Sequence, residues 1–126
     1  MIDNISNFQK EIYQRLAGNK FLNEIVTGVF TKVPQDTKFP YIVLEVANVK
    51  DHSTKTNEII KFELNISAYV RKLGQQQLFS IGSLIEDTLE DMNSTSCKIA
   101  FKNSNILQKT DGITQELIMQ YSVVLK

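Results

Sequence analysis

The 126-residue sequence has few of the residues on which catalysis and covalent stabilisation usually depend. It has one cysteine, Cys97, one histidine, His52, and no tryptophan. A single cysteine excludes an internal disulfide and fits a reducing compartment. The apolar runs reach only about four residues, far below the ~20 that a membrane-spanning helix needs. The N-terminal residues are polar and acidic, which is not the pattern of a signal peptide, so we expect synthesis in the cytoplasm and no membrane partner.

The sequence also has no excess of positive or negative charge. Lys and Arg together number 14, and so do Asp and Glu. A protein dedicated to nucleic acid usually has a basic excess or a basic stripe, so we expect no direct nucleic-acid recognition. The length fits a single domain spanning residues 1–126, which is large enough to bury a substantial core.

Catalytic motifs are absent. GxGxxG, GxxxxGK[ST], CxxC and HExxH do not occur, and the glycines are too scattered to form a phosphate-binding loop. His52 lies between Asp51 and Ser53, but three consecutive loop residues do not readily form a triad, so a solvated histidine is favoured. We likewise expect Cys97 to be a buried structural thiol.

An acidic cluster in a predicted helix could in principle attract a hard cation; it comprises Glu86, Asp87, Glu90 and Asp91. Calcium usually needs six to eight oxygen ligands, and no loop motif supplies them. We therefore interpret the cluster as a solvated helix face and expect no catalytic residue, no metal site and no cofactor.

Two segments have the apolar spacing of amphipathic helices. The N-terminal segment repeats an apolar residue every three or four positions, with Asn4 or Asp3 as a candidate cap and Gly18 at its end. A short helical turn, Lys20 to Val26, is expected to follow. The later segment, GQQQLFSIGSLIEDTLEDMN, has Gly82 in its interior, which suits close packing on a sheet. The apolar faces comprise Ile5, Phe8, Ile12 and Leu16 in the first, and Leu78, Ile81, Ile85, Leu89 and Met92 in the second.

The remaining apolar segments have the character of strands. The clearest alternation runs from Glu58 to Val70, where every even position from Ile60 onward is apolar. A polar stretch, VKDHSTKTNE, precedes it and predicts a long hairpin loop. The other predicted strands are Val29–Val33, Tyr41–Val49, Cys97–Phe101 with Ile106 and Leu107 continuing it beyond a kink, and Ile113–Leu125 after a turn at Asp111-Gly112.

The only two prolines stand six residues apart, in VFTKVPQDTKFPYIVLE. Pro34 is expected to end one strand and Pro40 to occupy the first position of the next, because proline cannot donate to a strand ladder. The Phe39-Pro40 bond can be cis or trans, and only about 5–6% of X-Pro bonds in folded proteins are cis.

The predicted order is α-β-β-β-α-β-β. Hairpin-linked strands indicate an α+β domain with a mainly antiparallel sheet, covered on one face by two amphipathic helices. The other face is not wholly polar, and unsealed strand edges favour assembly by edge pairing. The apolar residues expected on that face are Ile59, Tyr69, Ile118 and Val124.

The chain resembles the tail-completion or tail-terminator proteins of long-tailed bacteriophages and related gene-transfer particles. The resemblance covers most of the chain and rests on a helix such as EIYQRLAGNKFLNEIV, the pattern VP followed by FPYIVLE, the strand FELNISAYVR, the helix LFSIGSLIEDTLEDM and the closing segment LQKTDGITQELIMQYSVVL.

This resemblance implies a structural protein of the virion that carries no catalytic motif. The implied role is a ring, typically a hexamer, that caps the tail tube, ends tail polymerisation and binds the head-tail connector. The VKDHSTKTNE loop is similar to a protruding hairpin that reaches neighbouring subunits or the tube. We therefore predict assembly contacts at Lys50, Asp51, His52, Ser53 and Lys55. The alternatives are a head-side neck connector or stopper, or a small-ligand-binding or hydrolytic domain that uses His52 and the acidic helix face.

Overall fold

The computed structural model describes residues 1–71 and 75–126, so the start predicted for the later helix, at Gly74, lies outside the described residues. The predicted α+β class is confirmed, and the turn expected after Gly18 is a short helix of its own. In the described part of the chain the elements are α1 (Ile2–Ala17), α2 (Lys20–Ile25), β1 (Val29–Phe30), β2 (Tyr41–Asp51), β3 (Ile60–Arg71), α3 (Gln75–Asp91), β4 (Cys97–Gln108) and β5 (Thr114–Leu125).

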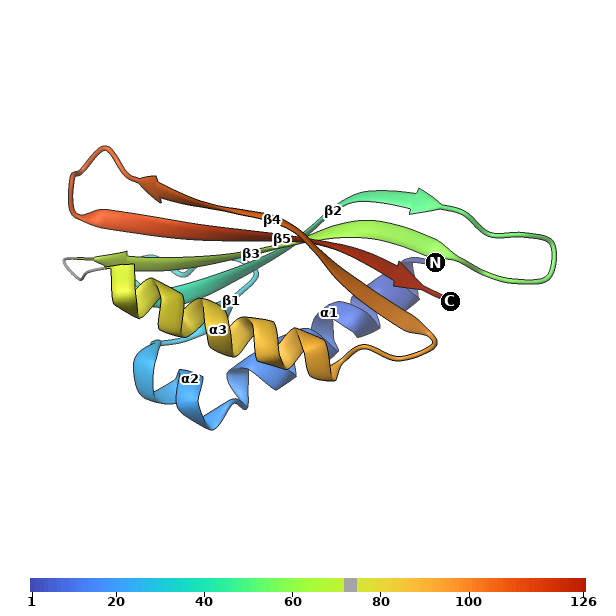
Figure 1. Ribbon diagram of the computed structural model, residues 1–126, viewed down its shortest axis with the longest axis horizontal. Helices are drawn as coiled ribbons and strands as arrows, with labels where there is room; N and C mark the ends of the chain where they lie inside the picture. Colours follow the sequence, from blue (N-terminus) through green and yellow to red (C-terminus); the bar gives the residue numbers. More distant parts are fainter. Residues whose placement is uncertain (72–74) are drawn as a thin grey trace.

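The strands form one twisted sheet in the order β1-β2-β3-β5-β4. All neighbouring strands are antiparallel except β1, which pairs in parallel with Ile42 and Val43 of β2. In the described residues, the three helices lie together on one face of the sheet, and the other face has no helix over it (Figure 1). The prediction of a mainly antiparallel sheet with a helical layer is therefore confirmed. No helix in the described residues is long and apolar enough to cross a bilayer.

The core lies between this helical layer and the sheet. Alternate residues of β3 are buried from end to end, as the period of two predicted. The ring of Phe8, from α1, meets that of Phe62, from β3, edge to face at 5.3 Å between centroids. The fully buried side chains include Ile12, Leu16, Leu22, Ile42, Leu44, Ile60, Phe62, Leu64, Ile66, Leu78, Ile81 and Ile85.

At Gly82, helix α3 packs closely against the sheet. A Cβ atom added there would lie 3.0 Å from Cδ2 of Leu117 on β5. Ordinary carbon contacts are longer, so a side chain at this position would push the helix or the leucine away. The close packing predicted from Gly82 is confirmed.

The structure corrects the predicted start of the first helix. The helix begins at Ile2, and Met1 stands at the N-cap without a side-chain hydrogen bond. Neither Asp3 nor Asn4 caps it, because both lie inside its first turn. The Asn4 amide instead donates to Oε1 of Glu58 at 3.3 Å.

Several strand boundaries also differ from the prediction. β2 extends to Asp51 across an irregularity at Asn48, whose φ is 53°. β3 begins at Ile60, two residues later than predicted. β4 is one long strand from Cys97 to Gln108, and the predicted kink is a register shift at Lys102.

The two prolines flank a loop, but only one of them adjoins a strand. β1 ends at Phe30, so the strand stops before Pro34 rather than at it. Pro40 directly precedes β2, and its peptide bond to Phe39 is cis. The Pro40 carbonyl accepts from the backbone N–H of Thr27 at 2.8 Å, which ties the loop to the start of β1.

Candidate assembly surface

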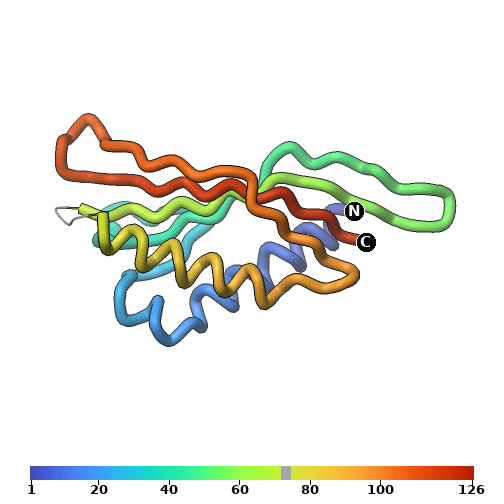
Figure 2. Tube along the Cα trace, in the orientation of Figure 1, coloured from blue at the N-terminus to red at the C-terminus, as the bar shows by residue number. Residues whose placement is uncertain are grey.

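The β2–β3 hairpin extends past the helical layer at one end of the molecule (Figure 2). Lys50 and Asp51 are the last residues of β2, and His52, Ser53 and Lys55 belong to the loop beyond it. All five side chains are exposed. The structure thus places the predicted contact residues together on one projecting hairpin.

Local hydrogen bonds order this loop. The backbone N–H of Ser53 donates to Oδ1 of Asp51 at 2.8 Å, and the hydrogen bonds from Ser53 hold the pKa of Asp51 below its ordinary value. The N–H of Ile59 donates to Oγ of Ser53 at 2.9 Å. The N–H of Thr54 donates to the Asn57 carbonyl at 2.8 Å. The hairpin therefore presents its side chains from a defined backbone.

The base of the hairpin is tied to the N-terminus. The Met1 ammonium lies 3.1 Å from Oε1 of Glu58. A cleft of about 740 Å³ opens beside this ion pair, between the start of α1, the hairpin base and the strand ends that carry Cys97 and Lys126. Its lining mixes polar and apolar groups, including Glu11 and Phe8.

In the part of the chain that the structure describes, neither His52 nor Cys97 has the partners that a catalytic site would need. Asp51 bonds to the Ser53 backbone rather than to His52. Burial, and then the nearby Glu11 carboxylate, raise the pKa of the half-buried Cys97, which disfavours the reactive thiolate. The acidic residues of α3 are exposed, and no cluster suited to a metal ion is found in residues 1–71 and 75–126.

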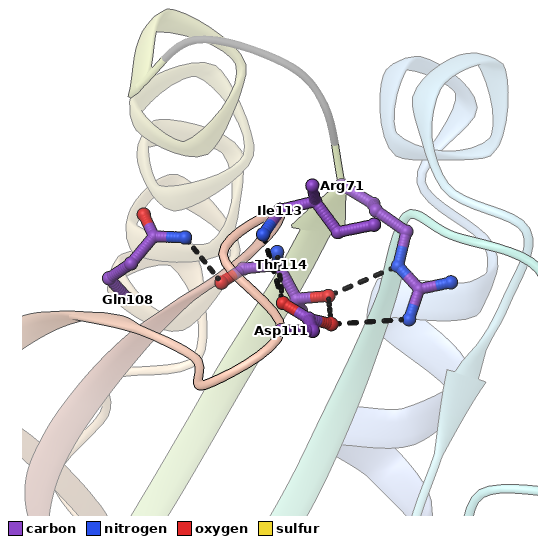
Figure 3. A network of polar contacts seen from close by, with 5 residues as sticks. All are labelled: Arg71, Gln108, Asp111, Ile113 and Thr114. Carbon is purple, nitrogen blue, oxygen red and sulfur yellow. Dashed lines mark hydrogen bonds and ion pairs between the residues drawn. The ribbon is translucent and has the colours of Figure 1, made fainter.

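Sequence reasoning missed a polar network at the opposite end of the sheet (Figure 3). Asp111 accepts hydrogen bonds from the N–H groups of Ile113 and Thr114 at 3.0 and 2.8 Å, and from Oγ1 of Thr114 at 2.6 Å. Arg71, from the end of β3, reaches Asp111 at 3.4 Å and Thr114 at 3.1 Å. Its guanidinium lies 4.3 Å from the centre of the Phe39 ring. The β4–β5 turn is therefore fastened to the end of β3.

A buried carboxylate lies next to this network on the helix-free face. Glu116 pairs with the Lys109 ammonium and accepts from the Tyr69 hydroxyl at 2.8 Å. Burial raises the pKa of Glu116, but hydrogen bonds from Lys109, Tyr69 and Ser67 outweigh it and hold the net pKa below its ordinary value. The Tyr69 ring stacks on Tyr41 of the neighbouring strand at 5.0 Å.

Two other surfaces are relevant to assembly. Ile59, Tyr69, Ile118 and Val124, predicted on the helix-free face, are half-buried. The edge strand β4 is more open, with Phe101 57%, Leu107 43% and Ile106 37% exposed. Large apolar side chains along a free sheet edge are typical of a surface that pairs with another chain.

The chain is thus a small α+β domain whose most exposed ordered features are a projecting hairpin and a long edge strand. The family model described as tail completion protein gp17 matches residues 10–126, and the chain belongs to this family. The family consists of structural components of phage-like particles rather than enzymes, which confirms the class expected from the sequence.

Two solved structures have the same fold. A chain in the virion of a native gene transfer agent particle superposes with a TM-score of 0.75 and 18% identity, over 90% of each chain. The gp17 protein of bacteriophage SPP1 superposes with a TM-score of 0.63 and 18% identity, over 94% of this chain and 88% of that one. No curated protein sequence matches the chain.

Proposed function

We propose that this protein forms a homo-oligomeric ring, a hexamer, that caps the finished tail tube, ends tail polymerisation and provides the surface to which the head-tail connector binds. The observation that carries the proposal is the family match over residues 10–126. In this role the subunit needs a face for the tube, a face for the connector and lateral contacts to two neighbours.

The surfaces of the chain support this role. Lateral contacts in a ring are heterologous, which means that two different patches of each subunit meet. The projecting hairpin with Lys50, Asp51, His52, Ser53 and Lys55 and the open strand β4 are two such patches on separate elements. The hairpin is the contact that we assign to a neighbouring subunit or the tube.

The direct test is tube growth. Tail tube protein is polymerised with and without the purified chain, and tube lengths are measured by electron microscopy. We expect shorter tubes, each with a ring at one end, when the chain is present. The Kd for tubes is measured in parallel by cosedimentation.

The proposal is overturned if the chain neither binds tube ends nor changes their length. Binding to isolated connector rings without any tube binding would favour a head-side neck component instead. A monomeric chain in solution does not contradict the proposal by itself, because a ring can close on its target.

A further inference from the structure

A shallow groove of about 200 Å³ runs between the second half of α3 and the edge strand β4. Apolar side chains from both elements form its sides, and Glu86 and Glu90 stand at its rim on α3. The lining residues are Glu86, Leu89, Glu90, Asn93, Ile99, Phe101 and Tyr121.

The floor of the groove contains an unsatisfied polar group. Tyr121 is only 3% exposed, yet its hydroxyl makes no hydrogen bond in the described residues. Burial, and then the nearby Glu86 carboxylate, raise the pKa of Tyr121 to about 12, so the phenol stays protonated at neutral pH. A buried hydroxyl without a partner costs free energy, which a ligand or partner offering an acceptor here would recover.

The strand edge beside the groove is sealed up to Ile99. The N–H of Cys97 donates to Oγ of Ser94 at 3.2 Å, and the Cys97 carbonyl accepts from the Ser94 N–H at 2.9 Å. Asn93 does the same for Ile99, accepting from its N–H at 2.8 Å and donating to its carbonyl at 3.3 Å. These residues occupy the outward backbone groups that a neighbouring strand would otherwise use.

Beyond Ile99 the edge is open. Outward and inward backbone groups alternate along an antiparallel strand. The backbone N–H and C=O of Phe101 therefore point away from β5, as those of Cys97 and Ile99 do. After the register shift at Lys102, the backbone groups of Lys109 point toward the neighbouring chain segment of β5, since its N–H donates to the Thr114 carbonyl at 2.8 Å. The same alternation then turns the backbone groups of Ser104, Ile106 and Gln108 outward, where no residue of the described chain bonds to them.

The groove therefore suits an extended segment that adds to β4 as a further strand. Such a segment would pair with the outward groups from Phe101 onward, offer an acceptor to Tyr121 and carry positive charge opposite Glu86 and Glu90. Its cations would then face two carboxylates on one helical face, four residues apart.

The hairpin of this same chain supplies two of those properties, an extended backbone and exposed positive charge. The end of β2 is extended, Val49 is 40% exposed, and Lys50 and Lys55 are exposed cations on either side of the loop's start. None of the groove's lining residues comes from the hairpin, so hairpin and groove are distinct patches. A contact between them is heterologous and can close a ring.

We propose that the α3–β4 groove, together with the open edge of β4 from Phe101 to Gln108, receives the β2–β3 hairpin of a second copy of this chain. The inference rests on the proposed ring and names the surface that closes it. Lys50 and Lys55 of one copy lie against Glu86 and Glu90 of the next, and the hairpin backbone pairs with the free edge.

Charge reversal tests the contact in the full chain. We expect the variant E86K/E90K to weaken self-association by about tenfold or more, measured by sedimentation alone and on tail tubes that lack the protein. The combined variant E86K/E90K/K50E/K55E restores association, because the two charges of each pair are exchanged. The matched control D87K/D91K changes the same net charge on the same helix, outside the groove, and leaves association unchanged. Urea unfolding of each variant checks that the monomer is folded.

A disulfide trap tests proximity directly. In a C97S background, one variant carries Lys50→Cys and another Glu90→Cys, and the two are mixed under mild oxidation. We expect a disulfide-linked dimer of the two variants, and little of it when Asp87→Cys replaces Glu90→Cys.

The outcomes separate this inference from the proposed function. Rings that form equally well with E86K/E90K overturn the groove contact and leave the capping role standing. Equal loss with D87K/D91K also overturns it, because the effect is then general electrostatics. A wild-type chain that associates neither with itself nor with tubes overturns both.

Discussion

Glu116 is a carboxylate buried on the sheet face that no helix covers, and it is only 5% exposed. Replacing it by alanine removes the acceptor of the Tyr69 hydroxyl and the partner of the Lys109 ammonium. We expect Glu116→Ala to lower the free energy of unfolding by about 1–3 kcal/mol, measured by urea denaturation. The matched change Glu45→Ala, at an exposed position of β2, should stay within about 0.5 kcal/mol of wild type. Equal effects would show that the Glu116 cluster is not stabilising.

Asp111 makes the stability of the β4–β5 turn dependent on pH. Hydrogen bonds from Thr114 and Ile113, with Arg71 nearby, lower the pKa of Asp111 from 3.8 to about 2. Since the unfolded chain binds this proton more readily, the contribution of Asp111 is complete above about pH 4 and is lost as the pH falls toward about 2. We expect Asp111→Asn to flatten the fall in unfolding free energy across that window.

The control for this titration is Asp36→Asn, since Asp36 lies in the exposed loop between β1 and β2. This change removes a carboxylate away from the β4–β5 turn, so the fall in unfolding free energy that Asp111 causes between pH 4 and pH 2 should remain. A wild-type slope that persists in Asp111→Asn would mean that other carboxylates, Glu116 among them, account for the acid sensitivity.

At the level of the helix, Gly82 sets the distance between α3 and β5. A larger side chain must displace Leu117, whose Cδ2 lies 3.0 Å from the position of an added Cβ. We expect Gly82→Leu to lower the free energy of unfolding by about 1–3 kcal/mol through overpacking. Ser83→Leu, one residue further along the same helix and exposed, serves as the control and should be nearly neutral in thermal unfolding. A neutral Gly82→Leu would contradict the tight contact.

At the level of the strand, neighbouring residues of β4 should respond differently to proline. The ladder alternation turns the N–H of Asn105 toward β5 and that of Ser104 outward. We expect Asn105→Pro to lower the free energy of unfolding by about 3 kcal/mol, since it removes a hydrogen bond of the ladder. Ser104→Pro should lower the free energy of unfolding far less. If the two variants unfolded at the same urea concentration, the assignment of outward backbone groups on the open edge of β4 would be wrong.

How far the elements could be predicted from the sequence depended on how they are buried. β3 is buried on alternate positions, and α1 and α3 on one stripe, so their periods were visible in the sequence. β4 has no such period because nearly every side chain beyond Ile99 is exposed, and so only part of it was predicted. The hairpin loop was predicted from the polar composition of the stretch that contains Lys50 to Lys55 and from its place between two strands.

The parts of the surface that depend on register could not be found in the sequence. Tyr69 lies opposite Glu116, and Phe101 opposite Tyr121, only because of how β5 pairs with β3 and β4. Residues so far apart in the chain give no local signal of that pairing. The buried carboxylate and the α3–β4 groove therefore appeared only with the fold.

At the level of the whole molecule, the hairpin should be separable from the fold. The loop side chains from Asp51 to Glu58 are exposed, and the core lies between the helices and the sheet. We expect shortening of the loop within residues 50–57 to leave thermal unfolding almost unchanged and to abolish assembly on tail tubes. Normal assembly of the shortened chain would show that the loop contacts assigned to Lys50, Asp51, His52, Ser53 and Lys55 are wrong.

The ion pair between the Met1 ammonium and Glu58 has a practical consequence for laboratory handling. Figure 1 shows both chain ends near the base of the hairpin, and the β4–β5 turn at the far end of the sheet. A purification tag or fluorescent label fused at either end would crowd the hairpin. The resulting loss of assembly would then be mistaken for a defect of the protein itself. Assembly measurements therefore need the chain without a fusion at either end, because both ends lie beside the surface that those measurements test.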